Sequence, residues 1–300
     1  MKTHESSPLA GPAELKPLMR KNDIRGLLQF SIHVALIGLA GWALGAATHW
    51  ALQCLLSIVL GILLVFVFAP LHESIHKTAF RTQRLNAAVG GVCGFLILLP
   101  PRYFQAFHMA HHRFTQVEGK DPELDTGKPE TWSRYLWQVS GLPYWIGQAG
   151  LLCRFASGDA NAHYIHRDKR PAIVREARWF LLLYAAVLTG GMLVGFAEIL
   201  RYWIIPVLVG QPFLRGFLLA EHTLCPRVAS MLENTRTTVT NRLVRFLCWN
   251  MCYHVEHHVW PSIPFHQLAA AHRLAGPHLH FLATGYVAVN RQILHSIDRR

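Results

Sequence analysis

Four long apolar runs limit what this chain can fold into more than any other feature of its sequence. The runs are residues 27–47, 51–69, 179–197 and 202–220. The length of each run is close to the ~20 residues that a helix needs to cross a bilayer. A helix also satisfies its backbone hydrogen bonds internally, as a segment in lipid must. Charged residues make up 15% of the chain, against about 25% in soluble domains. We therefore expect an all-α integral membrane protein with four transmembrane helices.

The regions outside these runs have different compositions. Residues 1–26 are polar and lack an apolar run that ends in a cleavage site, so we expect no removable signal peptide. We expect residues 27–300 to form a single membrane domain. Two shorter apolar stretches, 85–100 and 136–153, are interrupted by glycine or proline, which indicates interfacial or re-entrant helices. Arg215 lies inside the fourth run, where a charged side chain usually faces a cavity or the protein interior.

The basic residues predict the orientation of the runs. The segments 1–26, 70–178 and 221–300 hold 5, 14 and 8 of the 29 Lys and Arg residues. The two short loops on the opposite side hold only Arg201. Cytoplasmic segments carry such an excess, so we expect a multi-pass protein of a bacterial inner membrane with both termini cytoplasmic. These flanks also account for the net charge of +12, and no nucleic-acid motif accompanies it, so no nucleic-acid partner is expected.

Three short histidine motifs, which we call boxes one, two and three, lie on the predicted cytoplasmic side. Their histidines are His72 and His76, then His108, His111 and His112, then His254, His257 and His258. On a helix, residues three and four apart share one face, so each box is expected to aim its imidazoles at one point. Eight imidazoles are too many for one tetrahedral zinc ion. With His222, which follows the fourth run, they predict a site for two metal ions.

The position of this site limits its chemistry. It would lie at the cytoplasmic end of a helix bundle in lipid, where an acyl chain or terpenoid reaches it from the bilayer. Such substrates offer many inert C–H bonds, and their cleavage needs a strong oxidant, which oxygen and redox-active iron can generate. Imidazole is a suitable ligand for iron. A zinc pair would instead indicate hydrolysis.

The box sequences His-Glu-Ser-Ile-His, His-Met-Ala-His-His and His-Val-Glu-His-His resemble the three histidine boxes of the membrane fatty-acid desaturase family. The resemblance covers about residues 27–270 and includes the Pro-Ser-Ile-Pro sequence at 261–264. It implies a non-haem di-iron enzyme that uses O2 and external electrons to desaturate an acyl chain of a fatty acid or lipid. The same superfamily includes hydroxylases and ketolases of lipids, alkanes and carotenoids, so these activities remain open.

The resemblance also implies a division of the ligands. One iron ion would be bound by His72, His76, His112 and His258, and the other by His108, His111, His222, His254 and His257. Glu73, Glu221 and Glu256 are expected to orient histidines through the second ring nitrogen. Well-characterised acyl-CoA members carry an asparagine four residues before the isolated histidine. Leu218 occupies that position here, which argues against the acyl-CoA branch.

The sequence indicates that electrons come from another protein. It contains no haem motif of a fused cytochrome b5, no GxGxxG fingerprint and no clustered cysteines. We therefore expect a ferredoxin-, rubredoxin- or cytochrome b5-like donor with its reductase. Basic residues near the boxes would favour docking of an acidic donor.

Two functions from other classes remain open. Box one matches the HExxH motif of zinc metalloproteases, with Glu73 as the base, but this interpretation leaves six box histidines unexplained. A non-catalytic metal carrier would bind metal ions without consuming oxygen.

Overall fold

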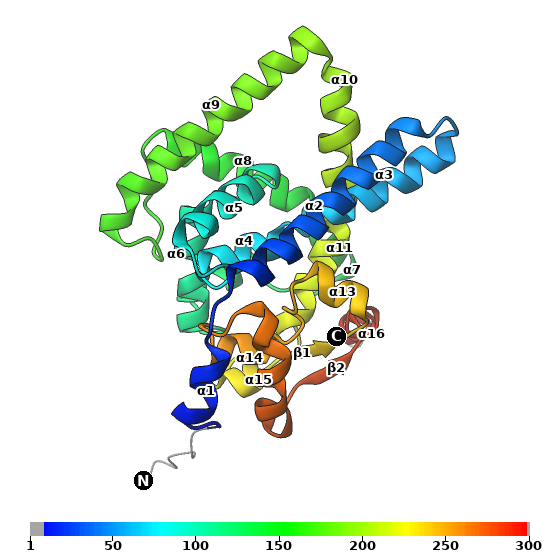
Figure 1. Ribbon diagram of the computed structural model, residues 1–300. Coiled ribbons are helices and arrows are strands. Elements are labelled where there is room, and N and C mark those ends of the chain that lie inside the picture. The colour runs from blue at the N-terminus through cyan, green and yellow to red at the C-terminus, as the bar shows by residue number, and fades with distance from the viewer. Residues whose placement is uncertain (1–8, 299–300) are drawn as a thin grey trace.

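The computed structural model describes residues 9–298, so residues 1–8 of the predicted N-terminal segment lie outside the described residues. The fold is mainly helical (Figure 1). The first half contains α1 (Pro12–Leu18), α2 (Asp23–Ala46), α3 (Trp50–Val65), α4 (Phe68–Ile75), α5 (Gln83–Leu96), α6 (Pro101–Phe114), α7 (Trp132–Val139) and α8 (Leu142–Ala156). The second half contains α9 (Arg170–Val194), α10 (Phe196–Ile199), α11 (Ile205–His222), α12 (Met231–Asn234), α13 (Arg242–Leu247), α14 (His254–Val259), α15 (Leu268–Ala275) and α16 (Tyr286–Ile297). Short helical turns lie at Pro122–Leu124, Arg167–Lys169, Leu200–Ile204, Phe265–Gln267 and Gly276–His278.

Three helices in the described part of the chain are long and apolar enough to cross a membrane: α2, the continuous α3–α4 and the continuous α10–α11. They contain the predicted runs 27–47, 51–69 and 202–220. The run 179–197 lies mostly in α9, which is not one of these three candidates, so its role as a span stays a prediction. Helices α5 and α6 meet at 96°, the geometry of a broken span or a re-entrant segment.

The connection between the third and fourth runs differs from the expected loop at residues 198–201. Gly195 has a φ of 139°, which a side chain would oppose, and it ends α9 so sharply that α10 begins at the next residue. Arg201 therefore lies inside a π-helical turn, where its guanidinium donates to the carbonyl oxygen of Leu44 at 2.7 Å. The loop prediction was wrong because a single glycine makes the whole reversal.

Two helical hairpin tips lie at one end of the molecule. In Figure 1 the turn between α2 and α3 and the corner between α9 and α10 are at the top, while α1, α14 and α15 are at the bottom. Helix α3 packs on α11 where Gly61 faces Gly210, and a Cβ on either glycine would collide with the other helix's backbone. Small residues at such crossings let membrane helices approach closely.

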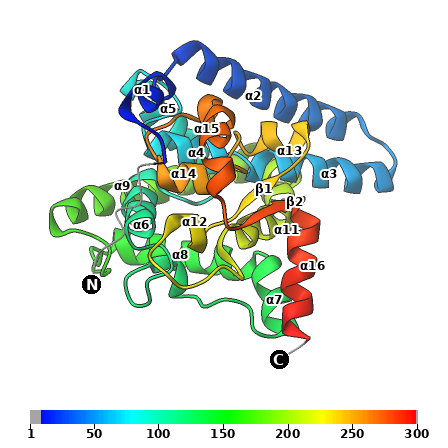
Figure 2. The ribbon, with the colours of Figure 1, turned by 90° about the horizontal axis from the view of Figure 1, so that it is seen from below.

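The prediction of an all-α protein was incomplete, because the structure contains a small parallel sheet. Strand β1 (Thr237–Val239) pairs with β2 (Leu282–Thr284), with Thr237 opposite Leu282. The β-branched sequence Thr-Thr-Val favours an extended backbone, but three residues are too few for a recognisable alternation. The sheet lies beside α16 and α11 when the molecule is seen from below (Figure 2). Its strand β1 is fixed to the chain before box three, since the Thr238 amide donates to the Cys252 carbonyl at 2.9 Å.

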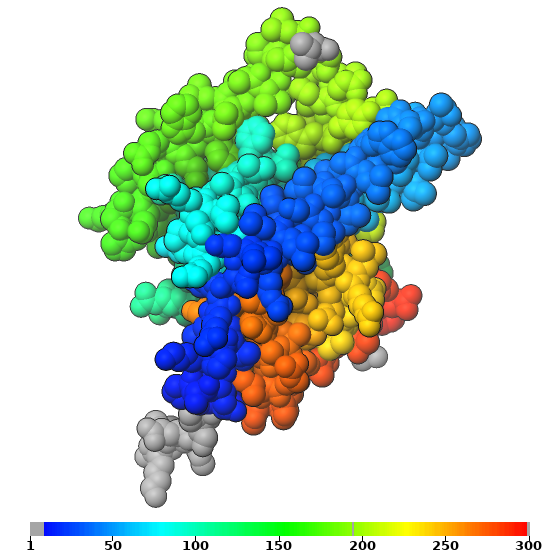
Figure 3. Space-filling view, viewed as in Figure 1, coloured from blue at the N-terminus to red at the C-terminus, as the bar shows by residue number. Residues whose placement is uncertain are grey.

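Two apolar clusters enclose the polar centre of the protein. One combines residues of α4, α5, α6, α8 and α9, and the other combines α2, α3 and α11 with residues 247–271. Phe68 and Trp145 pack against both. Leu15 and Leu18 of α1 join the second cluster, and Figure 3 shows this N-terminal helix lying against the C-terminal segment.

Candidate metal centre

Four helices bring the nine predicted histidines together. Box one lies at the end of α4, box two on α6 and box three on α14, and His222 is the last residue of α11. Their ring nitrogens form two groups, and within each group one ligand nitrogen from every histidine lies within 4.8 Å of the others. The five-histidine group contains His72, His76, His108, His112 and His257. The four-histidine group contains His111, His222, His254 and His258.

The spacing of the boxes explains the two groups. Successive helical residues are about 100° apart, so positions i and i+4 nearly overlap, whereas i+3 points to the other side of i. In box two, His108 and His112 join the five-histidine group and His111 joins the other. In box three, His254 and His258 share one group and His257 joins the other. Boxes two and three therefore serve both groups, so the expectation that a box aims all its imidazoles at one point was wrong for them, while both histidines of box one lie in the five-histidine group.

The observed groups also differ from the division that the family resemblance implied. His108 and His257 lie in the group of box one, and His258 lies in the group of His222. The side to which a box presents its pair depends on how its helix is rotated about its own axis. That rotation is set by packing between distant segments of the chain, and it cannot be predicted from the spacing of the histidines.

The donor set suits transition-metal ions. The Nε2 atoms of His72 and His108 lie 2.7 Å apart, those of His108 and His112 2.9 Å apart, and those of His222 and His254 3.1 Å apart. A neutral imidazole has one N–H and one acceptor nitrogen, so four or five of them aimed at one spot cannot all pair with one another. A metal ion would satisfy every nitrogen at once, and neutral imidazole is a common metal ligand.

Burial keeps these imidazoles in the form that binds metal. Burial first, and then repulsion from neighbouring imidazoles, holds the pKa values of His254, His257 and His258 well below their ordinary value. Burial also lowers the pKa of His76 to about 3. These four rings are therefore neutral at neutral pH, with free nitrogen lone pairs for a metal ion.

The outer ring nitrogens of the four-histidine group all have neighbours. Nδ1 of His111 lies 2.9 Å from Asp121 Oδ1, and Nδ1 of His254 lies 3.3 Å from Glu221 Oε1. The other two outer nitrogens contact the Asn234 carbonyl oxygen at 3.2 Å and the Thr115 hydroxyl at 3.3 Å. Such contacts fix the orientation of a ligand ring and raise its basicity. Glu221 thus lies where it can orient His254.

The other two predicted carboxylates lie elsewhere. Glu73 is buried and accepts hydrogen bonds from the Thr78 hydroxyl at 2.7 Å and the Phe265 amide at 3.1 Å. Glu256 accepts from the Thr237 hydroxyl at 2.5 Å and contacts His272. Among residues 9–298 neither carboxylate contacts one of the nine histidines. They tie boxes one and three to other segments, and a role in orienting a ligand stays a prediction for them.

No motif marks Asp121 as a partner of His111. It lies ten residues further along, in a loop where its carboxylate also accepts from the amides of Gln116 and Glu123. Burial raises the pKa of Asp121, but these hydrogen bonds and His111 outweigh burial and hold it below the ordinary value. Asp121 is therefore ionised, and the Asp-Pro turn at 121–122 was the only local signal of its position.

The histidines and cysteines outside the two groups have other surroundings. Nε2 of His33 lies 2.8 Å from the Leu63 carbonyl oxygen, so this histidine joins two helices. His163 and His166 are exposed in a loop, away from both groups. All six cysteines are free.

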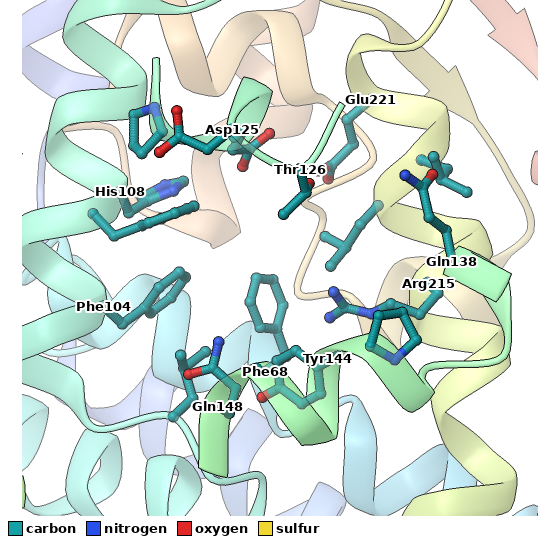
Figure 4. A pocket seen from close by; sticks show the side chains of 18 of the residues that line it. Phe68, Phe104, His108, Asp125, Thr126, Gln138, Tyr144, Gln148, Arg215 and Glu221 are labelled. Atoms are coloured by element: carbon teal, nitrogen blue, oxygen red, sulfur yellow. The ribbon is translucent and has the colours of Figure 1, made fainter. Parts of the chain in front are cut away.

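A cavity of about 450 Å³ opens onto both groups (Figure 4). His72 and His108 of the five-histidine group and His254 of the other line it. Phe68, Phe104 and Phe107 provide apolar walls nearby. Arg215 lines the cavity too, as expected for a charged residue within an apolar run. The volume is typical of small-molecule sites.

Comparison with known proteins gives a consistent result. A family model described as fatty acid desaturase matches residues 24–290. The chain is 25% identical over 262 residues to the sn-1 oleoyl-lipid 12-desaturase of Arthrospira platensis, covering 79% of this chain and 72% of that protein. It is 23% identical over 282 residues to the enzyme of the same name from Anabaena variabilis, covering 86% and 78%. It is also 26% identical over 220 residues to the dihydrorhizobitoxine desaturase of Bradyrhizobium elkanii, covering 66% and 62%.

Proposed function

Because the chain belongs to the fatty acid desaturase family, we propose that it is a membrane-bound di-iron oxidoreductase that uses O2 and external electrons to desaturate the acyl chain of a fatty acid or lipid. The observation that carries this proposal is the convergence of nine imidazoles, seven buried and two partly buried, in two adjacent groups. Both groups border one cavity with an apolar wall. This arrangement would present an alkyl chain to two metal ions at once.

The residues of the chain would divide the work as follows. The five-histidine and four-histidine groups would each hold one iron ion, and the bound pair would supply the oxidising power to remove hydrogen from an unactivated C–H bond. Asp121 and Glu221 would hold ligand rings in place. Phe68, Phe104 and Phe107 would position the alkyl chain and keep water away. Removing a second hydrogen gives an alkene, and small changes in pose would give an alcohol instead.

Mass spectrometry of lipids from cells that express the protein tests this function. We expect a new double bond that is absent when the cells express the His108→Ala variant. A new alcohol or ketone would identify the hydroxylase or ketolase alternative. Metal analysis of the purified protein should give about two iron ions per chain, whereas one zinc ion and no oxidation would support the metalloprotease. Bound metal without oxygen consumption would support a carrier.

We propose that an external donor provides the electrons. Purified protein should then be inactive with O2 and substrate alone, and a ferredoxin-, rubredoxin- or cytochrome b5-like carrier with its reductase should restore turnover. Arg81, Arg84 and Arg113 lie near the boxes in sequence, so docking of an acidic carrier should slow as salt rises. Turnover with NADH or NADPH and no partner protein would contradict the proposal.

The orientation of the protein is also a proposal. We place the histidine boxes and both termini in the cytoplasm, because the basic residues are concentrated in those segments. An accessibility tag at residue 125 or after residue 300 should report the cytoplasmic side, and a tag in the α2–α3 turn near Thr48 the opposite side. A tag at 125 found outside the cell would overturn this topology.

A further inference from the structure

The guanidinium of Arg215 lies at the cavity without an anion in direct contact among residues 9–298. Its side chain extends from α11 into the cavity, from the wall opposite His108 and Phe104 (Figure 4). In the described part of the chain, the guanidinium forms no hydrogen bond or ion pair, and its Nε is buried without a partner. Its one recorded contact is with the face of the Tyr144 ring, 4.5 Å from the ring centroid. A buried cation without an anion is costly, which indicates that its partner is a ligand.

The acidic residues that line the same cavity are engaged elsewhere. Glu221 faces Nδ1 of His254 at 3.3 Å, and Glu123 lies 3.7 Å from Nδ1 of His111. Asp125 is exposed to solvent. The other cation of the cavity is Lys128. Burial lowers the pKa of Lys128, and the nearby charges of Glu123 and Asp121 only partly oppose this effect. Among residues 9–298, Arg215 therefore remains a cation of the cavity lining with no ion pair to a carboxylate.

We propose that Arg215 binds the carboxylate of a monocarboxylic substrate, whose alkyl chain extends across the cavity toward His72, His108 and His254. This inference rests on the proposed function and names the substrate class. A guanidinium presents a planar fork that matches a carboxylate in shape and in charge. A phosphate carries up to two charges, and one unmatched cation would leave part of that charge uncompensated. The aromatic wall opposite Arg215 suits the alkyl part of such a molecule.

The geometry distinguishes a free acid from an ester-linked lipid. An ester has no charge to offer a guanidinium, so binding it would leave Arg215 buried and unpaired. A free carboxylate would satisfy the guanidinium and at the same time fix the distance between the charged end of the substrate and the histidines. Arg215 would then help to decide which carbon faces the metal centre, and Gln138 and Tyr144 lie beside it in the same lining (Figure 4).

Binding of small amphiphiles to the purified protein in nanodiscs tests the proposal without requiring turnover. The probes are octanoate, methyl octanoate and octyl phosphate, measured by equilibrium binding and by the shift in thermal unfolding midpoint that a ligand of the folded state produces. We expect octanoate to bind more tightly than the other two. Arg215→Gln should weaken octanoate binding about tenfold or more and leave methyl octanoate unchanged. Arg215→Lys should retain part of the preference, and the exposed Arg175→Gln should behave like the wild type.

The same variants test whether Arg215 is only structural. Because its charge is unmatched, the ligand-free Arg215→Gln variant should unfold at the same temperature as the wild type or a higher one. A clearly lower midpoint, or equal binding of octanoate and its methyl ester, would overturn the proposal. Tighter binding of octyl phosphate would assign the cavity to a phosphate-bearing lipid and would also overturn it. Binding that depends on Arg215 without any oxidation would leave this inference standing and contradict the proposed function instead.

Discussion

The two histidine groups are made of the same side chain but are held in different ways. In the four-histidine group every outer ring nitrogen has a polar neighbour: two carboxyl groups, a carbonyl oxygen and a hydroxyl, although the contact between Glu221 and His254 is not a hydrogen bond in the described structure. In the five-histidine group, Nδ1 of His72, His112 and His257 is buried without a hydrogen-bond partner in the described structure. A fourth member of this group, His76, also has a buried nitrogen, Nε2, without a partner in the described structure.

This difference indicates two ways to hold a metal ion. The four-histidine group has fewer imidazoles, but carboxyl groups behind two of them orient the rings, and the ionised Asp121 adds negative charge near the ion. The five-histidine group has one more imidazole and relies on close packing of neutral rings. The first group should therefore depend strongly on its surrounding residues, and the second on the number of its ligands.

The largest expected effect comes from removing a ligand. His222→Ala leaves three imidazoles in its group, whereas His76→Ala leaves four in the other. Both variants should lose oxidation to below about 1% of the wild-type rate, because the proposed chemistry needs both ions. Metal content should fall to about one ion per chain in His222→Ala and less far in His76→Ala. The exposed His163→Ala is the control, and full activity in His222→Ala would remove this residue from the centre.

A smaller effect is expected when the carboxyl groups behind the rings are replaced by amides. Asp121→Asn and Glu221→Gln keep the shape of the side chain but change the group that faces the ring nitrogen, so metal affinity should fall by about 10- to 100-fold. The measurement is metal release to a competing chelator. Asp125→Asn, in the same loop but not in contact with a box histidine, is the matched control. Equal release from all three variants would mean that the two groups are held alike.

Acid should separate the groups in a definite order. Burial lowers the pKa of His111, but the charges of Glu123 and Asp121 outweigh it, so the pKa lies above the ordinary value. The pKa of His76 lies at about 3. A histidine with a higher pKa takes up a proton, and so releases a metal ion, at a higher pH. Because His111 belongs to the four-histidine group, that group should lose its metal ion first as the pH falls below about 6. Metal analysis after dialysis across this range should show a step near one ion per chain; a single-step loss of both ions would contradict this order.

The smallest effect is expected at Thr115. Its hydroxyl lies 3.3 Å from Nδ1 of His258 and donates to the His111 carbonyl oxygen at 2.7 Å. Thr115→Val removes one neutral hydrogen bond from a ring that keeps its packing, so metal affinity should fall by less than about tenfold. Chelator competition should rank Thr115→Val below Asp121→Asn, and Thr115→Ser should match the wild type. If Thr115→Val lost more metal affinity than Asp121→Asn, the charge of the neighbour would not decide how strongly it supports a ligand ring.

The parts of the centre that were predictable are those encoded within one helical turn. The boxes and His222 could be identified from spacing and from their position after apolar runs, and the structure brings all nine histidines together. Their division between the groups depends on the rotation of each helix, and the neighbours Asp121, Thr115 and Asn234 depend on the paths of loops. The sharp corner at Gly195 and the strands β1 and β2 were missed because each rests on only a few residues.

The hydrogen bond from the Phe265 amide to Glu73 joins residues 192 positions apart. While a ribosome is still making the chain, box one can enter the membrane with α3 and α4 long before residue 265 has been synthesised. The buried carboxylate beside box one therefore acquires this partner only near the end of translation, and box three itself arrives just before it. Assembly of the centre is in this sense a late event, since the two groups are complete only when box three has been synthesised.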